Sequence, residues 1–131
     1  MNFVALVYNG HSYCYNGGND LAIAILGCFL SSDVGCTLSE NGLLLSSFGR
    51  WALEEGWRGA SGNITMVEKE NDYIYLSDLY SEERKPTELK MMVQQFVQLL
   101  DDWREKVCKR KPKEVTITYD GNQFTIETSD V

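Results

Sequence analysis

His11 is the only histidine in the chain, so any reaction that needs a proton carrier near neutral pH would depend on this side chain. Cys14 follows shortly afterwards and could supply the nucleophile of such a pair. However, His11 comes directly after Asn9-Gly10, a dipeptide typical of tight hairpin turns, where side chains are usually solvated. We therefore expect no catalytic residues, and a small enzyme of unknown reaction is the least favoured functional hypothesis.

The chain lacks the residue spacings that hold a metal ion or a phosphate group. Its cysteines form no Cys-x-x-Cys pair, and only one histidine could join them, so the sequence predicts no metal site. The glycine-rich segment 16–20 contains no nucleotide-binding fingerprint, and Asp20 stands where a bound anion would lie. We interpret this segment as a turn and a helix cap, and we expect no cofactor.

The charges of the chain are distributed unevenly. Its 131 residues include 19 acidic and 12 basic ones, which gives a formal charge of −7 and disfavours nucleic acid as a partner, because phosphate contacts need clustered Lys and Arg. Within residues 68–83, Lys69 is the single base among six carboxylates. Such a group can steer a basic protein towards the chain, although a simply solvated face is the alternative interpretation. The partner-binding residues predicted in this acidic stretch are Glu68, Glu70, Asp72, Asp78, Glu82 and Glu83.

The sequence predicts a cytoplasmic protein with reduced thiols. Residues 1–4 carry no positive side-chain charge before the apolar residues, unlike a secretory signal. The longest apolar run, 21–30, has about half of the ~20 residues that a membrane-spanning helix needs, so we expect no membrane partner. Buried thiols are the simplest role for the four cysteines, which are Cys14, Cys28, Cys36 and Cys108. A Cys28–Cys36 disulfide is left open because the sequence does not supply its geometry.

The N-terminal half, residues 1–60, contains a hairpin, an apolar helix and an irregular segment. Asn9-Gly10 predicts a turn between strands at 3–8 and 12–15. Asn19 or Asp20 can cap a helix over 21–30, which would end within 31–35. A short helix is expected over 47–55, and the nearby Trp51 and Trp57 fit either the core or an interface.

The C-terminal half, residues 61–131, is more regular. Alternating residues predict a hairpin from 64 to 76 around a polar turn at 68–72, and a second hairpin from 115 to 126 around Asp120-Gly121. Between them, apolar residues at three-to-four spacing predict a helix over 86–110, bracketed by Pro86 and Pro112. The sequence therefore predicts a single α+β domain, with one antiparallel sheet of about five to six strands and a long amphipathic helix packed on one face.

Residues 62–128 combine a hairpin, a long helix with Trp103, the segment 111–121 (KPKEVTITYDG) and a short last strand. This order, with the size and acidity of the chain, resembles the small immunity proteins of bacterial contact-dependent growth inhibition and related polymorphic toxin systems. The resemblance implies a cytoplasmic protein without catalytic residues. Such a protein binds one cognate toxin domain, often a nuclease, and blocks its active site or substrate path.

A second family of binding proteins is the alternative. Chaperones of type III secretion effectors are also acidic, of similar length, and built from helices against a twisted sheet. They typically open and close with helices, whereas this chain is predicted to open and close with strands. We therefore favour the immunity hypothesis over the chaperone hypothesis.

Overall fold

The computed structural model describes residues 1–78 and 88–130, and these residues form an α+β fold with two antiparallel sheets of four strands each. The first sheet has the order β2-β1-β7-β8 and consists of β1 (Asn2–Tyr8), β2 (Tyr13–Gly18), β7 (Glu114–Tyr119) and β8 (Phe124–Ser129). The second sheet has the order β3-β4-β5-β6 and consists of β3 (Gly59–Ser61), β4 (Thr65–Glu70), β5 (Tyr73–Asp78) and β6 (Glu88–Met92).

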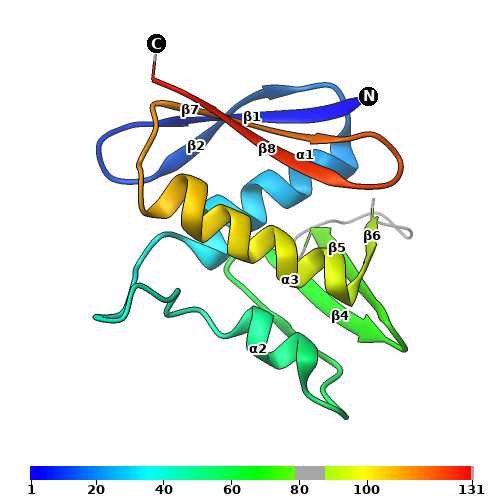
Figure 1. Ribbon diagram of the computed structural model, residues 1–131. Helices are drawn as coiled ribbons and strands as arrows, with labels where there is room; N and C mark the ends of the chain where they lie inside the picture. Colours follow the sequence, from blue (N-terminus) through cyan, green and yellow to red (C-terminus); the bar gives the residue numbers. More distant parts are fainter. Residues whose placement is uncertain (79–87, 131) are drawn as a thin grey trace.

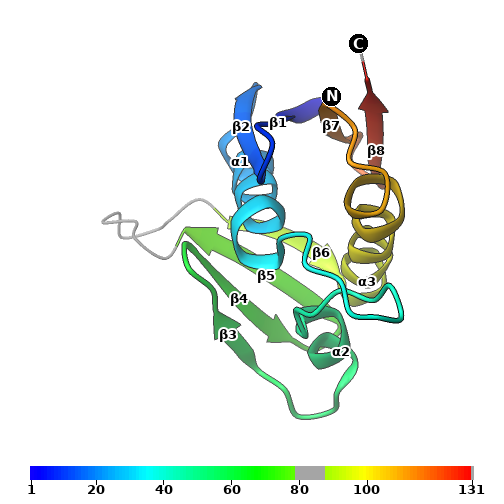
Figure 2. The same cartoon turned by 90° about the vertical axis from the view of Figure 1, so that its left-hand side faces the viewer.

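Two of the helices separate the two sheets. Helix α1 (Leu21–Cys28) continues as a wider π-type segment, η1 (Phe29–Val34), and α3 (Val93–Asp102) continues in the same way as η2 (Trp103–Cys108). The short helix α2 (Phe48–Leu53) packs against α3. In Figures 1 and 2, α1 and α3 form a middle layer, so each sheet has one face on the helices and one face turned outwards.

Helix α1 consists of apolar residues on all sides, and it can therefore pack between the two sheets and contact both of them. The Asp20 carboxylate caps it by accepting the N–H groups of Ala22 and Ile23 at 3.1 and 3.2 Å, which confirms the cap predicted at Asn19 or Asp20. The helix lies so close to β1 that a Cβ on Gly27 would be 2.8 Å from Val4 Cγ2. This close approach fixes the distance between α1 and the first sheet.

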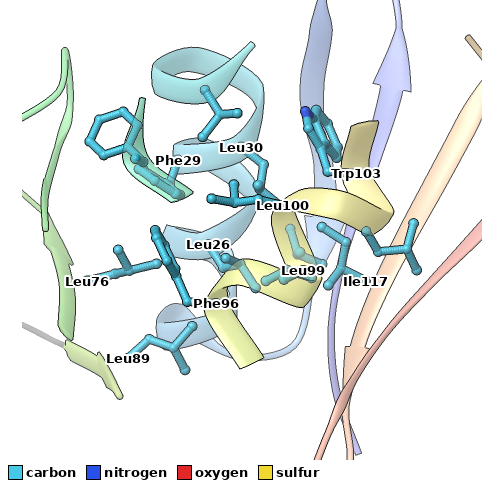
Figure 3. Packing of buried hydrophobic residues seen from close by; sticks show 14 of the residues in the cluster. Leu26, Phe29, Leu30, Leu76, Leu89, Phe96, Leu99, Leu100, Trp103 and Ile117 are labelled. Carbon is cyan, nitrogen blue, oxygen red and sulfur yellow. The ribbon is translucent and has the colours of Figure 1, made fainter. Parts of the chain in front are cut away.

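The buried hydrophobic residues meet between the layers, as Figure 3 shows. Phe29 lies at the centre of an aromatic group, with ring centroids 5.0 Å from Phe48 and 5.9 Å from Phe96. Trp103 is fully buried and donates its indole N–H to the Gly35 carbonyl at 2.9 Å. These contacts link α1, α2 and α3 into one core.

The expected single sheet of five to six strands is wrong. The N-terminal strand β1 pairs with β7, so the first and last hairpins join into one sheet. The central hairpin recruits β3 and β6 on its two sides and forms a second sheet. The individual hairpins were predicted from local turns, whereas the pairing of β1 with β7 depends on contacts between distant segments.

The predicted helix over 86–110 is wrong at its beginning. Residues 88–92 form β6, and α3 begins at Val93; Pro86 lies outside the described residues. In the strand, Leu89 and Met91 are buried, while Met92, which the helical pattern placed on the apolar face, is 44% exposed. The strand pairs with β5 along one edge and places Leu89 and Met91 against the core, and this burial favours the strand.

Three smaller predictions have mixed outcomes. The helix over 47–55 is confirmed as α2, which spans Phe48–Leu53. The expected polar turn at 68–72 shrinks to Asn71 and Asp72, with Asn71 at a φ of 56°, so residues 68–70 belong to β4. The first helix, expected over 21–30, is extended by η1 to Val34, so the helical segment ends within 31–35 as predicted.

The expectation of four reduced thiols is also wrong in the structure. Cys36 and Cys108 form a disulfide that joins residues 72 positions apart, while Cys14 and Cys28 are free. Spacing alone could not reveal this pair, because its Cα atoms come within 4.9 Å only through the packing of η2 against the segment after η1. Among the described residues, no helix is long and apolar enough to cross a membrane.

Candidate functional site

The outer face of the second sheet is the candidate functional site. Alternation along the strands buries Val67, Ile74 and Leu76 against the helices and turns their sequence neighbours the other way. The residues that share this second orientation, called the outer face below, are Met66, Glu68, Glu70, Tyr73, Tyr75, Ser77, Glu88, Lys90 and Met92.

Two tyrosines of the outer face stand on β5, which lies between β4 and β6. Tyr73 stands between Glu70 on β4 and Met92 on β6. In the next row, Tyr75 stands between Glu68 and Lys90. Directly opposed side chains in a sheet have Cβ atoms about 4.5–5.5 Å apart, so each tyrosine has a charged or flexible residue beside it on both sides.

The carboxylates of the outer face are not neutralised by the described residues. Glu68, Glu70 and Glu88 form no ion pair within residues 1–78 and 88–130. Lys90 is the one described cation of this face, and its Nζ lies 4.2 Å from the ring centroid of Tyr73 and 5.8 Å from that of Tyr75. The face therefore presents negative charge beside amphipathic rings.

The structure brings together only some residues of the predicted acidic stretch. Glu68 and Glu70 are exposed neighbours on the outer face. Asp72 lies in the β4–β5 turn, where its carbonyl accepts the N–H of Val93 at 2.9 Å. Asp78 ends β5 in the register of Thr65, which belongs to the opposite face. Glu82 and Glu83 lie outside the described residues.

Asp78 contributes instead to the electrostatics of the helix layer. Burial is the main reason that the pKa of Cys28 is raised, and the negative charges of Asp78 and Asp33 raise it further. The Cys28 thiol is therefore protonated at neutral pH and unsuited to nucleophilic chemistry.

The aromatic half of the outer face was missed in the sequence. Tyr73 and Tyr75 were assigned to a strand but not to a surface, and Lys90 was placed in a helix. The signal that could have found the tyrosines is the short turn at Asn71-Asp72, because a two-residue turn fixes Glu70 opposite Tyr73.

Asp33 binds the connection between β3 and β4 in the sheet that carries the outer face. Its carboxylate accepts the N–H groups of Asn63, Ile64 and Thr65 at 2.7, 3.2 and 3.0 Å, just before β4 begins. A Cβ on Gly62 would collide with the Asp33 carboxylate, so glycine is needed there for this close approach. Through these bonds η1 positions the β3–β4 connection.

The structure does not place His11 and Cys14, the pair considered in the sequence, in one cavity. His11 lines a cavity of about 150 Å³ together with Tyr8, Tyr13 and Lys111, whereas Cys14 does not line this cavity. Tyr13 donates its O–H to the Pro112 carbonyl at 2.6 Å, and burial raises its pKa to about 12. Within the described ranges, no three His, Cys, Asp or Glu side chains are grouped so that they could hold a metal ion.

Comparisons with known proteins give no relative: no family model, curated protein or solved structure matches the chain. The chemistry of the outer face is therefore the guide to function.

Proposed function

We propose that the chain is an immunity protein that binds and neutralises one copy of a basic bacterial toxin domain, with the outer face as the contact surface. The observation that carries this proposal is the pair of tyrosines, Tyr73 and Tyr75, beside Glu68 and Glu70, two carboxylates that form no ion pair with a described residue. Tyrosine and methionine are enriched in protein interfaces, and charged residues are common at their rims. The acidity of the whole chain and its sequence resemblance to immunity proteins support the same function.

The physical basis of neutralisation is competition for basic side chains. A nuclease uses Lys and Arg to hold phosphates, and carboxylates at the outer face can form charge-assisted hydrogen bonds with the same groups. Negative charge speeds the encounter, while buried tyrosines slow dissociation. A toxin covered in this way loses access to its substrate.

The proposed site of action is the cytoplasm, where a nuclease toxin meets its substrate. The Cys36–Cys108 disulfide is an observation against this compartment, because stable disulfides are rare in cytosolic proteins. Rapid alkylation of thiols in intact cells, followed by mass measurement, separates the two cases. Four alkylated cysteines support the cytoplasmic assignment, and two protected cysteines contradict it.

A growth rescue experiment tests the function. The gene just upstream of the gene for this chain is the source of the candidate toxin, and the C-terminal domain of its product is expressed in a sensitive bacterium. It is expressed together with this protein or, as control, with an unrelated acidic protein of similar size. We expect toxicity that only this protein abolishes. A toxic domain that is not neutralised, despite abundant folded protein, would contradict the immunity proposal.

A further inference from the structure

A second surface of the molecule has the features of a ligand site. A cleft of about 580 Å³ lies between the segment 39–53 and α3, a size within the range of about 300–1,000 Å³ that is typical of small-molecule pockets. In Figure 1, α2 and the segment before it lie below α3, and these elements carry most of the residues that line the cleft. The apolar residues of this leucine cleft are Leu43, Leu44, Leu45, Leu53, Val97 and Leu100.

The apolar wall of the leucine cleft is unusually open to solvent. Leu43, Leu45 and Leu53 are 52%, 60% and 65% exposed, and all three line the same cleft. Single exposed leucines are common on protein surfaces, but exposed leucines gathered around one concave site indicate that an apolar group binds there.

The cleft also contains polar atoms that the protein leaves without partners. Among the described residues, the side-chain atoms that are buried and make no hydrogen bond are Ser46 Oγ and Arg104 Nε. Both residues line the leucine cleft. Because an unpaired buried donor is costly, two such atoms in one cleft point to a ligand that supplies an acceptor.

The charges around the cleft favour an anionic acceptor. Two guanidinium groups, those of Arg50 and Arg104, line the cleft with one carboxylate, that of Asp101. Arg104 uses its terminal nitrogens for Asp101 at 3.5 Å and Glu105 at 3.3 Å, which leaves its Nε free. Arg50 donates to Ser47 Oγ at 2.8 Å and forms no ion pair with a described residue.

From these observations we infer that the leucine cleft binds a small amphipathic carboxylate, such as a medium-chain fatty acid. The apolar chain lies against the exposed leucines. The carboxylate pairs with the exposed Arg50 guanidinium, and a small shift of the cleft wall lets it accept hydrogen bonds from Arg104 Nε and Ser46 Oγ, which are buried in the unbound structure. This function is independent of toxin binding, because the cleft and the outer face share no residues.

The test is titration of the full chain with decanoate, below the critical micelle concentration, by calorimetry and by methyl NMR. We expect saturable binding that shifts the methyl signals of Leu45, Leu53 and Val97. 1-Decanol, which has the same chain without a carboxylate, should bind about tenfold more weakly or worse, because it lacks the charge-assisted hydrogen bonds. Decyltrimethylammonium should not bind in the cleft.

Variants locate the site. Ser46→Ala, Arg50→Gln and Arg104→Lys should each weaken decanoate binding by about tenfold. Leu45→Ser should also weaken it, while Leu21→Ser, at a leucine that is 72% exposed on α1 and does not line the cleft, should not.

Three results would overturn the proposal. One is the absence of saturable decanoate binding by the folded chain. Another is equal affinity for decanoate and decanol, which would show that apolar surface alone is recognised. The last is methyl shifts confined to residues outside the leucine cleft. Unchanged unfolding midpoints of Ser46→Ala and Arg50→Gln show that weaker binding by these variants reflects lost contacts and not lost structure.

Discussion

Replacing Asp33 by alanine tests how the β3–β4 connection is held. The substitution removes the acceptor of three backbone N–H groups. Asn63 is exposed and can bond to water, Ile64 is half-buried, and Thr65 is only 1% exposed. A buried N–H without a partner costs about 1–3 kcal/mol, so the losses at Ile64 and Thr65 together should lower the free energy of unfolding by about 2–4 kcal/mol.

Urea unfolding followed by tryptophan fluorescence measures this loss. With a slope of about 2 kcal/mol per M, a typical value for urea, the midpoint of Asp33→Ala should fall by about 1–2 M. Asp33→Asn keeps one oxygen acceptor and should lose less. Glu127→Ala, at an exposed carboxylate of β8, is the control and should stay within about 0.5 kcal/mol of the parent. If Asp33→Ala behaves like this control, the three hydrogen bonds do not hold the connection.

Two further predictions concern the disulfide and a buried tyrosine. Replacing Cys36 and Cys108 by serine should lower the free energy of unfolding by about 2–4 kcal/mol, because the disulfide links residues 72 positions apart. Urea unfolding measures this loss, and Cys14→Ser, at a free cysteine, is the control that should not show it. Equal stability of all variants would contradict the prediction. Burial raises the pKa of Tyr13 from its ordinary value of 10.0 to about 12. Between these two values the folded state retains a proton that the unfolded state loses, so the free energy of unfolding should fall as pH rises from about 10 to 12. Absorbance at 295 nm should show one late-ionising phenol that Tyr13→Phe removes; a titration unchanged by the substitution would refute the assignment.

Local features of the fold could be predicted from the sequence. The turns at Asn9-Gly10 and Asp120-Gly121 specify their own hairpins, and Asp20 begins the helix that it caps. Each of these signals acts between residues that are close in the chain, so composition and spacing are sufficient to identify them.

Longer-range features could not be predicted in this way. Leu89 and Val93 fit a helical stripe, yet residues 88–92 pair with β5 as β6, which buries Leu89 and Met91 in the core. The Cys36–Cys108 bond likewise depends on how η2 packs beside a distant segment. Competition between helical spacing and strand pairing is decided by tertiary contacts, which one sequence does not specify.

The sequence predicted the carboxylates of the candidate site, but it placed only some of them on the correct face of the sheet. Acidity alone identified Glu68 and Glu70, which share the outer face. The same reasoning grouped them with Asp78, although strand alternation turns that residue to the other face. Counting charges along the chain ignores which face of a strand each residue occupies, and the face that carries Glu68 and Glu70 also carries Tyr73 and Tyr75.

The most direct measurement is the association rate of the chain with the toxin domain used in the rescue experiment, at low and at high salt. Glu68→Lys/Glu70→Lys is compared with the matched control Glu114→Lys/Glu127→Lys, whose carboxylates are exposed on the first sheet. Each pair changes the formal charge by four, from −7 to −3. We expect the outer-face pair to slow association at low salt at least tenfold more than the control, with a weaker salt dependence. Equal rates for the two pairs would contradict the outer face as the toxin-binding surface.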